Sequence, residues 1–148
     1  MQPPGFTSVP FKTESSHGLT SYNGIAKFSS AGIVLEFESK LLGVIPGGVK
    51  EVRLPIGELL DVKFKKGFFR YGAKIEIRTR TFAVLAALPN HNGRVTLKLI
   101  RDDFELGKNA VEQIQKDLAG YVADLPPART PVSQLFEDES EDETRQLS

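Results

Sequence analysis

Residues 95–125, VTLKLIRDDFELGKNAVEQIQKDLAGYVADL, change their hydrophobic period partway through, and this change decides the fold. The first five residues alternate apolar and polar side chains, which predicts a strand with one buried face. Beyond residue 105 the apolar residues recur at spacings of three, four and seven, which places them on one stripe of a helix. The stripe consists of Val111, Ile114, Leu118, Tyr121, Val122 and Leu125. The stretch therefore predicts a strand followed by one amphipathic helix that lays its stripe on a sheet.

The limits of this helix are also predicted by sequence. Asp102, Asp103 and Glu105 are acidic residues of the kind that cap a helix start and interact favourably with its dipole. Gly120 is a candidate end, and the pair at 126–127, Pro-Pro, must end the helix because proline cannot continue it.

Upstream of residue 95 the pattern is a series of short strands. Alternation at 22–29 and 32–39, around the turn sequence Ser-Ser-Ala-Gly at 29–32, predicts a hairpin. Shorter bursts of alternating or apolar residues occur at 52–54, 62–65, 74–78 and 82–85. Seven strands with short connections favour an antiparallel barrel or sandwich, and with the helix they define the α+β class.

The two ends of the chain differ from this central part. Residues 1–18 are rich in Pro, Ser, Thr and Gly, which predicts a flexible arm, or an extended segment that packs through Phe6, Val9 and Phe11. We place one domain at 19–125 and an acidic tail at 126–148. The tail is either a disordered, solubilising segment or a docking peptide anchored by Leu135 and Phe136.

Charge is balanced over the chain but segregated along it. The 19 basic and 19 acidic side chains cancel, yet residues 63–101 hold ten bases and one acid, whereas 102–148 hold four bases and twelve acids. Six acids lie in the seven residues that begin with Glu137, Asp138 and Glu139. This asymmetry predicts that the acidic tail makes an intramolecular contact with the basic strands and competes with an acidic ligand.

Several function classes have no residues to support them. Cysteine is absent, and the two histidines, His17 and His91, have no carboxylate or hydroxyl at a catalytic spacing. We therefore expect a non-enzymatic protein without cofactor or metal. No secretory signal is evident, and the longest apolar run, residues 82–88, is far shorter than the roughly 20 residues that span a bilayer. A cytoplasmic location, or a peripheral one at the membrane, is expected.

Three segments carry a family resemblance. Residues 53–62, RLPIGELLDV, resemble the corner between the third and fourth strands of bacterial pleckstrin-homology (PH)-like and GRAM-type domains. Residues 74–79, KIEIRT, are similar to their fifth strand, and 95–99, VTLKL, leading into Asp102-Asp103-Phe104, to their seventh strand and helix. The order and spacing of these segments cover about two-thirds of the chain.

The resemblance implies a PH-like, seven-stranded antiparallel, partly open barrel capped by one C-terminal helix. It also implies binding to phosphoinositides, membrane surfaces or peptides. PH domains that recognise phosphoinositides usually do so through several bases around the first hairpin loop. The corresponding residues here, 27–32, contain only Lys27 as a base, so specific phosphoinositide recognition is not expected.

Two loops are candidate docking elements. Residues 63–72, KFKKGFFRYG, combine an aromatic hairpin tip with bases, so the rings either insert into an anionic membrane or fold back into the barrel mouth. The residues concerned are Lys63, Lys65, Lys66, Phe68, Phe69, Arg70 and Tyr71. Residues 41–48, which include Leu42, Val44 and Ile45, form a second loop that joins the first in one exposed apolar patch, unless Val44 and Ile45 cover the core.

The strands between these loops and the helix predict a basic face. The outward-facing bases are Lys63, Lys65, Lys74, Arg78, Arg80 and Lys98. They are either simply solvated or attract an acidic lipid, a nucleic acid or an acidic peptide, and specific nucleic-acid binding is not expected because no known motif accompanies them. The sequence therefore favours an adaptor that docks a protein partner or an anionic membrane, with structural homo-oligomerisation as the alternative.

Overall fold

A computed structural model describes residues 5–15, 18–42, 44–67 and 71–125 of the chain, without the side chains of Ile45 and Tyr71. The strands are β1 (Thr7–Glu14), β2 (Thr20–Ser29), β3 (Gly32–Leu41), β4 (Ile45–Pro55), β5 (Leu59–Lys66), β6 (Tyr71–Thr79) and β7 (Arg94–Ile100), and the helix is α1 (Phe104–Asp124). Short 3-10 turns lie at Ile56–Glu58 (η1), Ala83–Leu85 (η2) and Arg101–Asp103 (η3).

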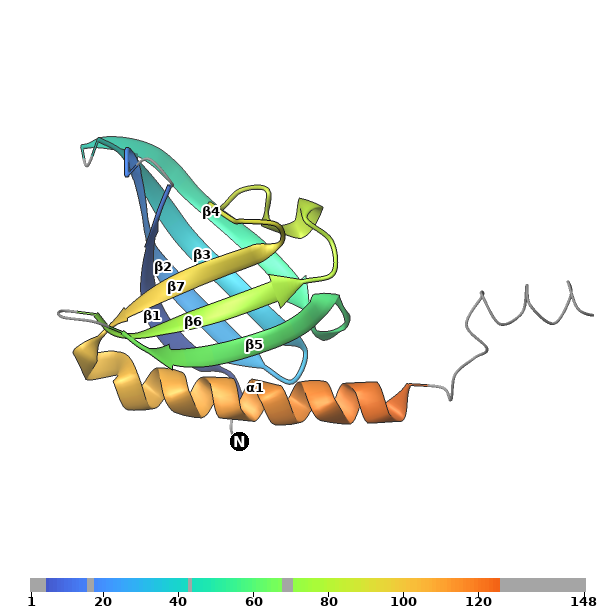
Figure 1. Ribbon diagram of the computed structural model, residues 1–148. Helices are drawn as coiled ribbons and strands as arrows, with labels where there is room; N and C mark the ends of the chain where they lie inside the picture. The colour runs from blue at the N-terminus through green and yellow to red at the C-terminus, as the bar shows by residue number, and fades with distance from the viewer. Residues whose placement is uncertain (1–4, 16–17, 43, 68–70, 126–148) are drawn as a thin grey trace, which may run out of the picture.

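The seven strands form one antiparallel sheet in the order β4-β3-β2-β1-β7-β6-β5 (Figure 1). Two meanders, β1 to β4 and β5 to β7, are joined where β1 pairs with β7 at Lys12 and Lys98. In the described residues β4 and β5 are the two ends of the sheet and do not pair with each other, so the sheet stays open. The α+β class, the seven antiparallel strands and the single C-terminal helix are therefore confirmed.

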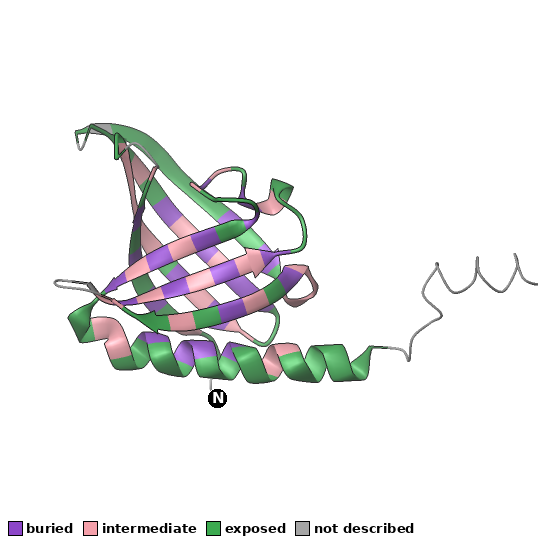
Figure 2. Ribbon diagram, viewed as in Figure 1, coloured by how far each residue is buried: buried purple, intermediate pink, exposed green. Residues whose placement is uncertain are grey.

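The core fills the inside of the curved sheet. Inward positions alternate with outward ones along the strands, which gives the banded burial in Figure 2 and follows from the period of two. The fully buried side chains include Leu35, Leu54, Ile75, Leu97 and Leu99. Helix α1 closes one side of this core with Val111 and Ile114. The ring of Phe104 packs edge to face on that of Phe64, with 5.1 Å between the ring centroids.

The first strand corrects the expected domain limits. Residues 7–14 fall inside the segment assigned to a flexible arm, yet they pair with β2 over their whole length and bury Val9 and Phe11. The packed extended segment was the better interpretation. Two of the three segments quoted for the family resemblance move up by one strand: residues 53–62 join the fourth strand to the fifth, and 74–79 lie in the sixth. Residues 95–99 lie in the seventh strand, as expected.

The apolar run at 82–85 is not a strand. Its centre is the turn η2, and the buried Leu85 and Leu88 plug the core from a loop. Turn residues that face the core are apolar for the same reason as strand residues, and a run this short cannot distinguish the two by period.

The helix runs to the later of its two predicted ends, and its start is capped differently than expected. It passes through Gly120 and ends at Asp124, where Leu125 adopts an extended conformation before proline. Asp103 precedes the helix but makes no capping hydrogen bond through its side chain, and both Asp102 and Asp103 lie in the turn η3. Only the first half of α1 holds buried residues; Figure 2 shows its second half largely exposed.

Candidate functional site

Four lysines stand in one row across the outer face of four neighbouring strands. Lys65 of β5 is directly opposite Lys74 of β6, Lys74 is opposite Lys98 of β7, and Lys98 is opposite Lys12 of β1. Directly opposite residues in an antiparallel sheet point to the same face with Cβ atoms about 4.5–5.5 Å apart. We call Lys12, Lys65, Lys74 and Lys98 the lysine row.

The lysine row is electrostatically unfavourable for the fold itself. Like charges directly opposite each other destabilise a sheet, and the row contains three such pairs in succession. Glu76 relieves the repulsion at Lys65, because Lys65 Nζ lies 3.1 Å from Glu76 Oε2, and Lys98 also has an interaction partner. The outward positions of β5, β6, β7 and β1 together carry seven bases and three acids. This face therefore retains an excess of positive charge.

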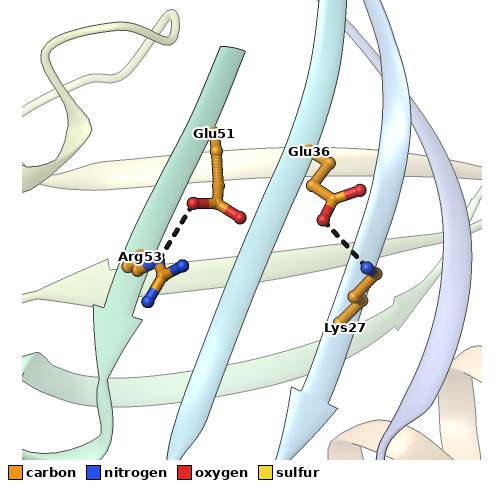
Figure 3. A network of polar contacts seen from close by, with 4 residues as sticks. All are labelled: Lys27, Glu36, Glu51 and Arg53. Carbon is orange, nitrogen blue, oxygen red and sulfur yellow. Dashed lines mark hydrogen bonds and ion pairs between the residues drawn. The ribbon is translucent and has the colours of Figure 1, made fainter.

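The opposite half of the sheet has a different charge pattern. Glu36 of β3 and Glu51 of β4 are also directly opposite each other, but each has a basic partner (Figure 3). Lys27 Nζ lies 2.8 Å from Glu36 Oε1, and Arg53 Nε donates to Glu51 Oε2 at 2.9 Å. Charge on the outer face of β2, β3 and β4 is thus paired at this point, whereas the lysine row has more bases than acids.

Most of the bases expected on this face are found there. Lys63, Lys65, Lys74 and Arg78 point outward from β5 and β6, and Lys66 is exposed at the end of β5. Arg78 Nη1 donates to Asp61 Oδ2 at 3.0 Å, a partly exposed pair. Such surface pairs are worth about 0–1 kcal/mol and can exchange partners when a ligand arrives.

Arg80 does not join the lysine row. It follows β6 at the far end from Lys74, where its Nε donates to the carbonyl oxygen of Gly57 at 3.0 Å. Its backbone N–H donates to the carbonyl of Glu58. This side chain links η1 to the end of β6, so Arg80 stabilises the fold at this point.

Two bases of the face were missed by sequence reasoning. Lys12 was placed in an arm and Arg94 was not singled out, although Arg94 is directly opposite Arg78. The signal for Lys12 was present, because Val9, Phe11 and Thr13 are buried and alternate with exposed residues along β1. The cross-strand register that aligns the four lysines has no counterpart in a single sequence.

The two candidate loops are only partly described. Phe68, Phe69 and Arg70 lie outside the described residues, as does the side chain of Tyr71, so the aromatic tip stays a prediction. The other loop is shorter than expected, because β4 begins at Ile45. Leu42 and Val44 are exposed, Val44 at 75%, so Val44 does not cover the core. The side chain of Ile45 lies outside the described residues, and the joint patch of the two loops is likewise a prediction.

A groove of about 520 Å³ separates the edge of β5 from the second half of α1. Val62 and Lys63 form its strand wall, and Leu118 and Val122 are on its helix wall. Gln115 bridges the two walls, because its Nε2 donates to the Val62 carbonyl at 2.8 Å. The whole apolar stripe of the helix was expected to pack on the sheet; Leu118 does pack against the core, whereas Val122 is half exposed.

The described part of the chain places the acidic and histidine candidates apart from one another. No cluster of three His, Asp or Glu side chains that could hold a metal ion occurs there. Asp102 and Asp103 are consecutive residues of η3, and His91 is exposed in the turn before β7, whereas His17 lies outside the described residues. No helix in those residues is long and apolar enough to cross a membrane.

Fold and surface together define a class: a small α+β protein with an open seven-stranded antiparallel sheet, a basic outer face and an apolar groove beside its helix. Comparisons of the chain with protein-family models, with curated proteins and with solved structures each give no match.

Proposed function

We propose that the chain is a non-enzymatic, PH-like binding module that docks an acidic protein segment on the lysine row. The PH-like assignment is supported by the order of elements, two meanders of four and three antiparallel strands followed by one helix. The observation that carries the function is the lysine row. Its three successive like-charge pairs lower the stability of the sheet, and an anionic ligand bound to the row would remove this repulsion.

The dimensions of the row suit an extended peptide. Neighbouring strands lie about 4.8 Å apart, so the four lysines span roughly 14 Å. An extended peptide advances about 3.3 Å per residue, so about five residues cover the row and bring several carboxylates to it. An acidic segment of that length is the ligand we propose.

A membrane surface is the less favoured ligand of the same face. Membrane docking would combine the bases with inserted apolar side chains. The exposed apolar residues Leu42 and Val44 connect β3 to β4, at the other end of the strand order from β5 and β6. Because this apolar loop does not adjoin the lysine row in the sheet, it does not provide inserted side chains beside the row, and this favours a protein segment over a lipid surface.

The test compares two charge-matched double variants of the full chain. Lys12→Gln with Lys74→Gln removes two members of the row and no ion pair that the described residues make. Lys40→Gln with Lys50→Gln removes the same charge from exposed positions on β3 and β4. We expect the row variant to bind a fluorescent ten-residue polyglutamate peptide about tenfold more weakly in anisotropy titrations, and the control less than threefold.

Three outcomes would contradict the proposal. Equal losses in both variants would mean that the peptide responds only to net charge. Binding to vesicles containing anionic lipid, but not to the peptide, would favour the membrane. Tighter binding to single-stranded DNA than to the peptide, with the same dependence on the row, would make nucleic acid the ligand.

A structural role in homo-oligomers is the second candidate, and one observation favours it. Strand β4 is a sheet edge that is exposed from Pro46 to Glu51, with Val49 at 78%. Exposed edges can pair with a second chain, although Pro46 and the irregular register between Glu38 and Lys40 are devices that hinder such pairing. We therefore expect light scattering to give the monomer mass at all concentrations from about 10 µM to about 1 mM. A mass that rises with concentration would instead support assembly.

A further inference from the structure

The apolar stripe of α1 continues beyond the part that the sheet covers. Leu118 is half-buried, Val122 is 50% exposed and Leu125 is 43% exposed, and all three follow Val111 and Ile114 at helical spacing. A helix face that meets only water is normally polar. Figure 1 shows the last turns of α1 extending past the sheet. Leu118 still packs against the core and Tyr121 lies near Gly57 of η1, so Val122 and Leu125 are the exposed end of the stripe.

The groove beside this stripe is apolar and accessible. Leu118, Ala119, Val122 and Ala123 form one wall of the roughly 520 Å³ space. On the other wall, the Asp61 carboxylate is neutralised by Arg78, so it does not repel an acidic chain strongly. Asp61 Oδ1 is buried without a hydrogen-bond partner among the described residues. An unpaired buried acceptor is costly, and a bound segment would bring backbone N–H groups to this wall.

We propose that residues 132–136 of the same chain occupy this groove, with Leu135 and Phe136 as apolar anchors, and so deliver the acidic run at 137–143 to the lysine row. The groove contact stands on its own, and the delivery to the row rests on the proposed function.

The chain between Leu125 and Leu135 is long enough for this segment to reach the groove. The chain leaves α1 at Leu125, which itself belongs to the uncovered stripe. Leu135 follows ten residues later and can lie up to about 33 Å away. The groove runs back from there toward Gln115, about 15 Å along the helix axis. A tether of this length holds the segment at an effective concentration in the millimolar range, so weak contacts suffice to fill the groove.

The chemistry of the segment matches both surfaces in the right order. Val132, Leu135 and Phe136 form a short apolar cluster, and six acids follow immediately. Lys63 belongs to the groove wall, and Lys65, two residues further along the same face of β5, begins the lysine row. If Leu135 and Phe136 bind in the groove beside Lys63, the acidic residues that follow them lie next to the row.

Such an arrangement would regulate the row. Each chain carries one acidic run for its own row, so an external acidic peptide would bind only after displacing it. Because displacement breaks the apolar contacts in the groove as well, changes in Leu135 and Phe136 should alter peptide affinity without changing any charge.

Cysteine cross-linking tests the groove contact in the full chain, which has no native cysteine. Ala119 is in the groove wall, whereas Gly120 is exposed on the adjacent face, where a side chain added at its Cα would meet no atom within 4 Å. We expect Ala119→Cys with Ser133→Cys to form an intramolecular disulfide about tenfold faster than Gly120→Cys with Ser133→Cys. The separations along the chain, fourteen and thirteen residues, are nearly equal. Leu135→Ser with Phe136→Ser should abolish the difference.

Equal rates in the two pairs would overturn the groove contact, and disulfides formed only between chains would assign the groove to a second copy. For the regulatory step, Leu135→Ser with Phe136→Ser should bind the polyglutamate peptide about three- to tenfold more tightly than the native chain. Faster cross-linking of the Ala119→Cys pair together with unchanged peptide affinity would overturn only the delivery of the acidic run to the row and would leave the groove contact standing. Insensitivity of the peptide to Lys12→Gln with Lys74→Gln would instead contradict the proposed function and leave the groove contact intact.

Discussion

Phe11→Ala is expected to lower the free energy of unfolding by about 3–5 kcal/mol, the usual cost of truncating a buried phenylalanine. Phe11 is 3% exposed in the middle of β1, which lies between β2 and β7 in the sheet. The truncation leaves a cavity between the two meanders, where pairing of β1 with β7 is limited to the register point at Lys12. Urea denaturation followed by circular dichroism measures the change.

Phe6→Ala is the matched control. Phe6 lies five residues earlier and is 49% exposed, with its ring 5.6 Å from Lys27 Nζ. Its removal should cost no more than about 1 kcal/mol, the value of an exposed cation–π contact. If both variants unfold at the same urea concentration as the native chain, the first fourteen residues are not part of the cooperative unit.

The missed first strand shows what composition conceals. Pro10 and the Ser and Thr residues around it resemble an arm, because such residues are common in loose segments. Yet Val9, Phe11 and Thr13 alternate with outward residues as in any half-buried strand. Periodicity is therefore a stronger signal than composition over this segment.

The hairpin and the helix were predictable because each depends on local residues alone. The hairpin of β2 and β3 turns at 29–32, with Gly32 at φ 137°, a conformation that few other residues adopt. The helix was predictable from the helical spacing of its apolar residues. Coverage of the stripe could not be predicted, because it depends on where the sheet ends relative to Leu118 and Val122.

The candidate site was predictable in composition and not in geometry. Alternation placed Lys65, Lys74 and Lys98 on outward faces correctly. Their alignment depends on strand order and register, and a slip of one residue would turn each lysine to the other face. The junction of β1 with β7 adds Lys12 to the row, and that junction joins residues 86 positions apart in the chain.

Gly24→Ala is expected to destabilise the protein by about 3 kcal/mol or more. Gly24 of β2 lies in register between Phe11 of β1 and Phe37 of β3. A Cβ at this position would clash with the carbonyl oxygen of Glu36 and would lie 2.7 Å from Cα of Phe37. These are backbone atoms held by the β2–β3 ladder, so relief requires the strands to move apart, and overpacking that moves backbone exceeds the usual cost of about 1–3 kcal/mol.

Gly120→Ala is the control for the same chemical change, and it should act in the opposite direction. Gly120 is exposed within α1, and no atom lies within 4 Å of the added Cβ, so alanine gains helix propensity of about 0.5–1 kcal/mol without a clash. Opposite shifts in the urea midpoint would establish that close approach of β2 and β3 at Gly24, and not loss of glycine as such, limits stability. A Gly24→Ala protein as stable as the native chain would mean that β2 and β3 are further apart at this point than the clash with Glu36 implies.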